Sequence, residues 1–240
     1  MIRALLVFMS IASVLFLAPQ LGLAQSTTRI FDVELGIPLS QLPTDEWVNP
    51  ACGTNGGPPS IELPTFADYG RCPVESETGL REIWFIYDNE WEYIARAYRD
   101  PAEIGRYSAN VFYRQPIITS LMLDDMGRIQ GYRVITDPRA PVEVRMEADL
   151  LFTVFKTLFS GPWQCEDLQP GEGEGPLDGV FIKSRCISFS EQRFVKIEAH
   201  LLRKRGEDYY RNPLQGYFEG FSRLEVYSAA AISGQTCCPG

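Results

Sequence analysis

The sequence predicts an α+β protein in which an antiparallel sheet of several hairpins is covered by one main amphipathic helix and stapled by disulfides. Three observations carry this prediction. Strand patterns recur along the chain, one strongly apolar helical pattern covers residues 143–159, and four of the six cysteines bracket two irregular segments. Because an apolar helix must bury one side, we expect it to lie on a face of the sheet.

Residues 1–24 have the pattern of a secretory signal peptide. Arg3 stands near the start, an apolar run covers residues 4–17, and small residues precede a cleavage site after Ala24. The run is shorter than the roughly 20 residues that a membrane-spanning helix needs. We therefore expect an exported protein with no transmembrane segment after cleavage, in the bacterial periplasm or secreted. Residues 25–227 are expected to form a single domain, and residues 228–240 a flexible tail.

Aromatic and β-branched residues mark three hairpins and a final strand at residues 222–228. In the first hairpin, Ile83, Phe85 and Tyr87 share one face while the opposite face is also apolar, which is typical of a central strand. A short helical turn is expected after Pro38. The predicted hairpins span residues 81–99, 116–137 and 180–204, with turns at 88–90, 124–127 and 190–192.

The predicted helix over residues 143–159 ends at the breaker sequence Ser160–Gly161–Pro162. Its apolar positions recur at helical spacing. The apolar side of the helix comprises Val144, Ala148, Leu151, Phe155, Leu158 and Phe159.

A weak internal duplication is a further hypothesis, because each half of the chain leads through a cysteine-bracketed segment into a hairpin.

The cysteine spacing predicts two local disulfides, Cys52–Cys72 and Cys165–Cys186. Each would close an irregular loop, which is worth roughly 3 kcal/mol in the chain-entropy model. A zinc site would need a short C-x-x-C pair or histidine partners, which the sequence lacks. Cys237 and Cys238 stand in the small-residue tail, where they could bridge each other, join a second chain or stay free.

The net charge argues against nucleic acid as a partner. Removal of Arg3 with the signal peptide leaves 21 basic against 31 acidic residues, a formal charge of −10. Such a balance opposes binding to nucleic acid or anionic lipid through bulk electrostatics.

Catalytic and cofactor motifs are missing from the sequence. His200 is the only histidine, and alternation places it on the polar face of a strand with Lys196 and Glu198, facing solvent. Neither a G-x-S-x-G elbow, a P-loop nor a dinucleotide fingerprint occurs, so we expect no cofactor and no metal. The acidic loop 166–178 could offer oxygen ligands to a cation, but it lacks the calcium-loop spacing and is expected to be solvated.

Aromatic residues near the C-terminus are the candidate ligand-binding site. They lie between strand patterns, where core packing explains them less easily, and tyrosines suit recognition surfaces. The candidate residues of this aromatic site are Tyr209, Tyr210, Tyr217 and Phe218.

In the segment bracketed by Cys52 and Cys72, a structural clasp is the preferred interpretation and a ligand-binding loop remains a hypothesis.

These observations favour an exported, non-enzymatic binding or accessory protein whose partner is a small molecule, a glycan or a protein. One alternative is a secreted hydrolase that uses carboxylates of Glu90, Glu92 or the 166–178 loop. Another is a structural or assembly factor that dimerises through Cys237 or Cys238.

Overall fold

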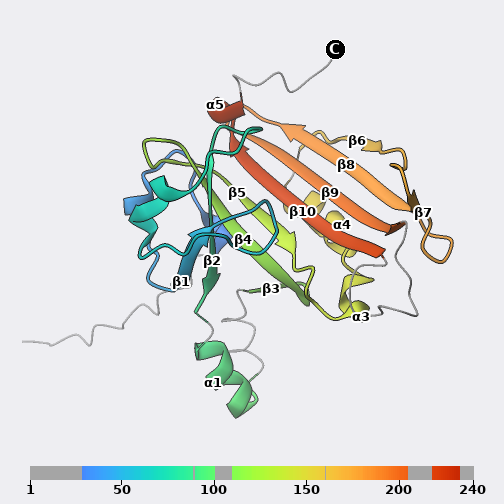
Figure 1. The fold of residues 1–240 in the computed structure, drawn as a ribbon, viewed down its shortest axis with the longest axis horizontal. Coiled ribbons are helices and arrows are strands. Elements are labelled where there is room, and N and C mark those ends of the chain that lie inside the picture. Colours follow the sequence, from blue (N-terminus) through green and yellow to red (C-terminus); the bar gives the residue numbers. More distant parts are fainter. Residues whose placement is uncertain (1–28, 89, 101–109, 160, 205–217, 233–240) are drawn as a thin grey trace, which may run out of the picture.

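A computed structural model describes residues 29–88, 90–100, 110–159, 161–204 and 218–232. Within these ranges ten strands form one sheet in which every pairing is antiparallel, and eight of them follow the order β1-β2-β4-β5-β10-β9-β8-β6 (Figure 1). The strands are β1 (Trp47–Cys52), β2 (Arg81–Tyr87), β3 (Val111–Phe112), β4 (Gln115–Leu123), β5 (Ile129–Thr136), β6 (Gln164–Asp167), β7 (Glu174–Gly175), β8 (Ile182–Phe189), β9 (Arg193–Lys204) and β10 (Phe218–Ser228).

The sheet consists of two four-stranded meanders joined at their last strands. Strands β1, β2, β4 and β5 form the first meander and β6, β8, β9 and β10 the second, and β5 pairs with β10 at the centre. Strand β3 adds to β4, and β7 adds to β9. Both meanders run from the outer edge of the sheet inward. The hypothesis of an internal duplication remains a prediction.

Gly131 lies at the seam between the meanders, directly opposite Tyr227 of β10. A Cβ atom on Gly131 would lie 2.5 Å from the backbone oxygen of Val226 and 2.5 Å from Cδ1 of Tyr227. We predict that Gly131→Ala lowers the free energy of unfolding by about 1–3 kcal/mol, since the backbone must shift to make room. Urea denaturation measures the loss. The control is Gly70→Ala, where a Cβ would meet nothing within 4 Å, and an equal loss there would contradict this explanation.

The second and third predicted hairpins are confirmed. They are β4–β5 and β8–β9, with turns at residues 124–128 and 190–192. Strand β2 is central, between β1 and β4, as the two apolar faces of its sequence predict. The turn after Pro38 is the 3₁₀ helix η2 (Leu39–Gln41). In β9 the expected inward residues Val195, Ile197, Ala199 and Leu201 are all buried.

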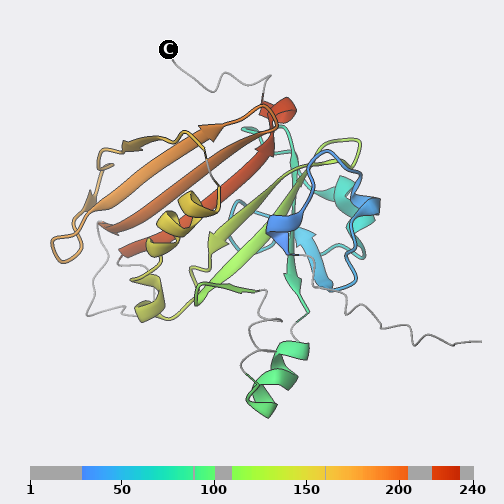
Figure 2. The same ribbon diagram turned by 180° about the vertical axis from the view of Figure 1, so that it is seen from behind.

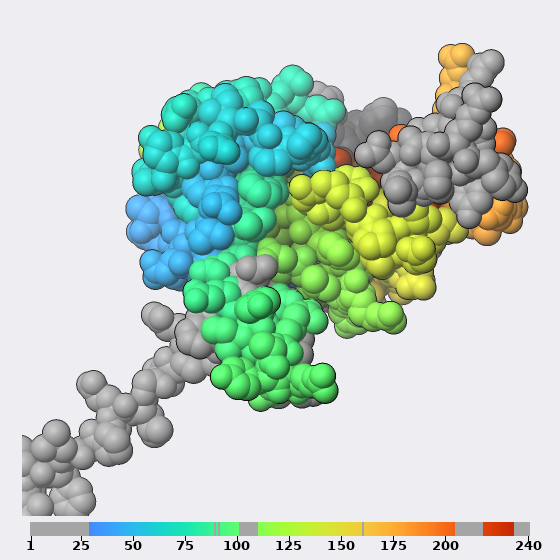
Figure 3. Space-filling model, turned by 60° about the horizontal axis from the view of Figure 1, so that its bottom comes forward, coloured from blue at the N-terminus to red at the C-terminus, as the bar shows by residue number. Residues whose placement is uncertain are grey.

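The first predicted hairpin is wrong in its second arm, which is the helix α1 (Glu90–Tyr98). The Oδ1 atom of Asp88 accepts a hydrogen bond from the backbone N–H of Glu90, so Asp88 satisfies one free donor of the first turn. Glu92 and Arg96, one helical turn apart, form an ion pair. Helix α1 stands out from the body of the protein (Figure 3), and its Tyr93 and Tyr98 are exposed.

The predicted helix over 143–159 is two helices, α3 (Val142–Arg145) and α4 (Leu150–Leu158). The break follows from contacts with β10. The hydroxyl of Ser222 donates to the carbonyl oxygen of Ala148 at 2.8 Å. The backbone N–H of Phe152, which in a continuous α-helix would donate to that same carbonyl, donates to the carbonyl oxygen of Asp149 instead. The expectation of one main helix is therefore corrected, although Leu151, Phe155 and Phe159 are buried as predicted.

The main hydrophobic cluster lies on one face of the sheet, and a smaller one that includes Met122, Phe194 and Tyr227 lies on the other. Helix α4 covers β9 and β10 on the face of the main cluster, and the segments containing η1 (Ile30–Asp32), η2 and η3 (Phe66–Arg71) cover the first meander (Figure 2). Helix α5 (Ala229–Ile232) extends the packed body into the predicted tail, because Ile232 is buried. In the described part of the chain, none of the helices has the length and apolar character needed to cross a membrane.

Candidate functional site

A pocket of about 300 Å³ lies on the surface of the first meander, where η2, η3 and the β4–β5 turn meet. All three segments are far apart in the sequence, so the fold alone brings them together. The lining residues are Pro38, Leu39, Ser40, Leu42, Thr44, Phe66, Ala67, Tyr69, Met126 and Gly127.

Backbone hydrogen bonds fix the η2 wall of the pocket to the β4–β5 turn. The N–H of Leu39 donates to the carbonyl oxygen of Gly127 at 2.9 Å, and the N–H of Gly36 donates to that of Ile129 at 2.7 Å. The turn is rigid because Oδ1 of Asp124 accepts the N–H of Met126 and because Gly127 takes a φ of 72°. This arrangement leaves the Met126 side chain 78% exposed at the rim.

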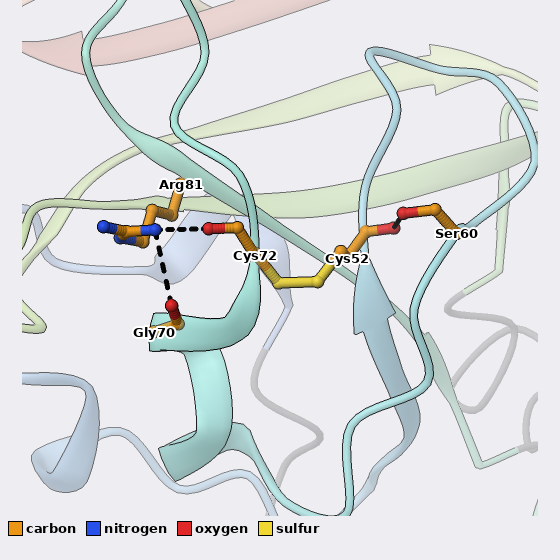
Figure 4. Close-up of a disulfide and its surroundings, with 5 residues drawn as sticks. All are labelled: Cys52, Ser60, Gly70, Cys72 and Arg81. Carbon is orange, nitrogen blue, oxygen red and sulfur yellow. Dashed lines mark hydrogen bonds between the residues drawn. A yellow bond between two sulfur atoms is a disulfide. The ribbon is translucent and has the colours of Figure 1, made fainter.

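The η3 wall is held by a capping box and by the predicted Cys52–Cys72 disulfide, which is present. Oδ2 of Asp68 accepts both the N–H and the hydroxyl of Thr65 at the start of η3. At its end, the Arg81 guanidinium donates to the carbonyl oxygens of Gly70 and Cys72 (Figure 4). Both ends of η3 are therefore tied to neighbouring groups, and the disulfide predicted from the cysteine spacing is present.

The pocket is apolar and uncharged. Among the described residues that line it, none carries a formal charge, and the hydroxyls of Ser40, Thr44 and Tyr69 are its polar side-chain groups. The Tyr69 hydroxyl donates to the carbonyl oxygen of Asp125 at 3.4 Å. Such a lining can bind a neutral apolar molecule by dispersion and by contact with sulfur and aromatic rings. It offers neither a metal ligand set nor an acid–base pair.

The aromatic site predicted near the C-terminus is only partly described. Tyr209, Tyr210 and Tyr217 lie outside the described residues. Phe218 begins β10 and is buried, with the Arg145 guanidinium carbon 4.6 Å from its ring centroid. The expected exposure therefore does not hold for Phe218, because its ring packs beneath Arg145 in the described structure.

The acidic residues of the 166–178 loop are largely tied to neighbouring side chains. Glu174 bonds Lys183 and the N–H of Gly171, which lower the pKa of its carboxyl group. Glu166 pairs with Arg185, and Asp167 accepts the hydroxyl of Ser184. Within the described ranges, no group of three or more His, Cys, Asp or Glu residues could hold a metal ion.

His200 is less exposed than its strand pattern indicates. Its side chain is 13% exposed, its Nδ1 atom contacts the Glu219 carboxylate, and its ring lies 4.4 Å from that of Phe221. Burial alone would raise the pKa of Glu219, but hydrogen bonds from His200 and Lys204 outweigh it and lower that pKa to about 2. His200 is thus held in an ion-pair cluster on the sheet face, and the predicted solvent-facing position is corrected.

A second cluster of charges, with Arg133, Glu82 and Glu225 buried at its centre, lies on the face of the sheet opposite the main core. The Arg133 guanidinium bonds carboxylates of Glu75, Glu82 and Glu225 at 2.9–3.0 Å. Burial opposes ionisation of Glu225, but Lys196, Arg133 and Arg223 outweigh it and lower its pKa to about 2. We call this set of three cations and three anions the Arg133 cluster.

The Arg133 cluster also holds residues 53–57 onto the sheet. The N–H of Asn55 donates to Oε2 of Glu82 at 2.7 Å, and Arg223 donates to the side-chain and backbone oxygens of Asn55. Gly53 allows this approach, because a Cβ there would lie 2.4 Å from the Glu82 side chain. The cluster therefore joins this segment to the sheet through paired charges, although Oε1 of Glu82 and Nε of Arg223 are buried without a hydrogen-bond partner among the described residues.

Sequence reasoning did not place the ligand site at this pocket. A ligand-binding loop between Cys52 and Cys72 was a general hypothesis, and Phe66 and Tyr69 of that segment line the pocket. Leu39, Leu42 and Met126 were missed, because only the folded sheet brings their segments to η3. No protein-family model, curated protein or solved structure matches the chain.

Proposed function

We propose that this is an exported, non-enzymatic protein that binds a small neutral apolar molecule, with the bacterial periplasm as its compartment. The pocket between η2, η3 and the β4–β5 turn carries the proposal. The signal-peptide pattern of residues 1–24 and the two disulfides, Cys52–Cys72 and Cys165–Cys186, support export to an oxidising compartment.

The pocket has the character of a ligand site. Its volume of about 300 Å³ lies at the lower end of the range for small-molecule sites, which are mostly apolar with a few placed polar groups. Its walls are preformed by the Leu39–Gly127 hydrogen bond and by the disulfide at Cys72. A preformed wall lowers the ordering cost of binding.

The lining also selects the class of ligand. A charged ligand would lose its hydration without gaining a counter-charge from the lining, which opposes its binding. An aromatic or branched apolar molecule can contact Phe66, Leu42 and the thioether of Met126. A single hydroxyl or carbonyl on that molecule could bond Ser40 or Thr44.

The carboxylates named for a hydrolase do not line this pocket. Glu92 is paired with Arg96, and Glu90 is exposed at the start of α1. Burial raises the pKa of Asp149, yet Asp149 lines neither this pocket nor the small one beside Tyr87. The binding function therefore has the more specific support.

We predict that N-phenyl-1-naphthylamine, a neutral aromatic amine that fluoresces in apolar surroundings, binds saturably to the folded protein. Ala67→Trp, which fills the pocket from η3, is expected to weaken this binding at least about tenfold. The matched control is Ala97→Trp on the exposed side of α1, away from the pocket. Equal weakening by both variants, or none by Ala67→Trp, would contradict the site.

Native mass spectrometry of the protein purified from the compartment to which its host exports it tests the rest of the proposal. Cleavage after Ala24 predicts a mature chain that begins at Gln25. An uncharged small molecule that copurifies with this chain, and is lost from Ala67→Trp, would identify the natural ligand. An unprocessed chain retained in the cytoplasm would overturn export.

A further inference from the structure

The two disulfides differ sharply in their exposure. Cys52 and Cys72 are both buried beneath η3 and the first meander. Cys165 is exposed on β6, a four-residue edge strand whose residues are all exposed, and its partner Cys186 is buried on β8. Of the four cysteines in the two disulfides, Cys165 is the exposed residue and the other three are buried, so a thiol from solution meets Cys165 before its partner.

A lysine lies beside the exposed sulfur. The Nζ atom of Lys156, in the last turn of α4, is 3.5 Å from Sγ of Cys165. Glu166 follows Cys165 directly, but strand alternation directs its side chain to the other face, where it pairs with Arg185. The ammonium therefore attracts an approaching thiolate and stabilises the negative charge that spreads over the sulfur atoms during exchange.

We propose that Cys165 is a thiol-exchange site, at which a small thiol such as glutathione or the thiolate of a thiol–disulfide oxidoreductase forms a mixed disulfide. The thiolate sulfur attacks Sγ of Cys165, and a new S–S bond forms there. The Cys165–Cys186 bond breaks, and its electron pair stays on Sγ of Cys186, which then takes a proton from water. The incoming thiol is oxidised to the mixed disulfide and Cys186 is reduced.

Opening of this bond is expected to release β6. Among the described residues the strand pairs with β8 alone, at the end of the strand order. A four-residue edge strand without its cross-link opens easily, since its backbone hydrogen bonds are close to solvent. The amides of residues 164–167 should therefore lose hydrogen-exchange protection when the adduct forms, while those of β5 and β10 keep theirs.

The test exposes the folded protein to reduced glutathione, stops the exchange with acid, and alkylates free thiols with N-ethylmaleimide after unfolding. Peptide mapping should show glutathione on Cys165, maleimide on Cys186 and an intact Cys52–Cys72 bond. We expect Cys165–Cys186 to open at least about tenfold faster than Cys52–Cys72. Glutathione on Cys186 instead, or equal opening of both bonds, would overturn the proposal.

Charge removal tests the role assigned to Lys156. Lys156→Gln should slow formation of the adduct about two- to fivefold, the size of a surface charge interaction. Arg139→Gln removes a surface charge that pairs with Asp137 and that no contact in the described part of the chain joins to Cys165, and it should leave the rate unchanged. Equal rates for the two variants would show that Lys156 does not promote the exchange.

Discussion

Replacement of Arg133 by leucine is expected to lower the free energy of unfolding by about 3–5 kcal/mol, because it leaves buried carboxylates without the positive charge that pairs with them. The side chains of Arg133 and Glu82 are each 3% exposed, and that of Glu225 is 5% exposed. Urea denaturation at neutral pH measures the loss. Arg139→Leu is the control, since its ion pair with Asp137 is at the surface and should contribute less than about 1 kcal/mol.

The pH dependence of this loss checks its cause. The pKa of Glu225 is lowered from 4.5 to about 2 on folding, so the ionised group stabilises the native protein fully above pH 4.5. That contribution is lost as the pH falls from 4.5 towards 2. The difference in the free energy of unfolding between the native protein and Arg133→Leu should therefore become smaller as the pH falls over this range. A loss that is constant with pH would assign the effect to packing alone.

Removal of the Cys52–Cys72 disulfide by the double change to alanine is expected to cost about 3 kcal/mol of stability and to weaken binding of N-phenyl-1-naphthylamine. Binding suffers because η3, which supplies Phe66, Ala67 and Tyr69, ends at Cys72. Thermal unfolding and fluorescence titration measure the two effects separately.

The second disulfide supplies the matched control. Cys165 and Cys186 are separated by 21 residues, against 20 for the first pair, so the chain-entropy model predicts nearly the same loss of stability. Because Cys165 and Cys186 lie in the second meander, their replacement by alanine should leave binding unchanged. Equal weakening of binding by both double variants would mean that the first disulfide does not shape the pocket specifically.

Local patterns predicted those parts of the fold that depend on neighbours in the sequence. The β4–β5 and β8–β9 hairpins were found because strand alternation and turn residues lie within a short stretch. The helix α1 was missed because its aromatic residues resemble a strand, although Glu92 and Arg96 stand one helical turn apart. The break between α3 and α4 depends on Ser222 of β10, and no local pattern reports such a contact.

The candidate site was predictable only in part for the same reason. The sequence offered the segment between Cys52 and Cys72 only as a hypothetical ligand loop, and Phe218 of the predicted aromatic site does not line the pocket. The η2 wall depends on the hydrogen bond from Leu39 to Gly127, which joins residues 88 positions apart in the sequence. Likewise, nothing near Arg133 in the sequence indicates that Glu75, Glu82 and Glu225 will converge on it.

Methyl NMR of methionine-labelled protein tests the proposed ligand site most directly. Beyond residue 24 the sequence has three methionines, and of these Met126 lines the pocket, whereas Met122 is buried and Met146 is partly buried against the cluster of Leu177, Leu201 and Phe218. Addition of N-phenyl-1-naphthylamine should shift the Met126 methyl resonance saturably and leave the other two unchanged. A saturating fluorescence signal with an unmoved Met126 resonance would place the ligand elsewhere and contradict the proposed site.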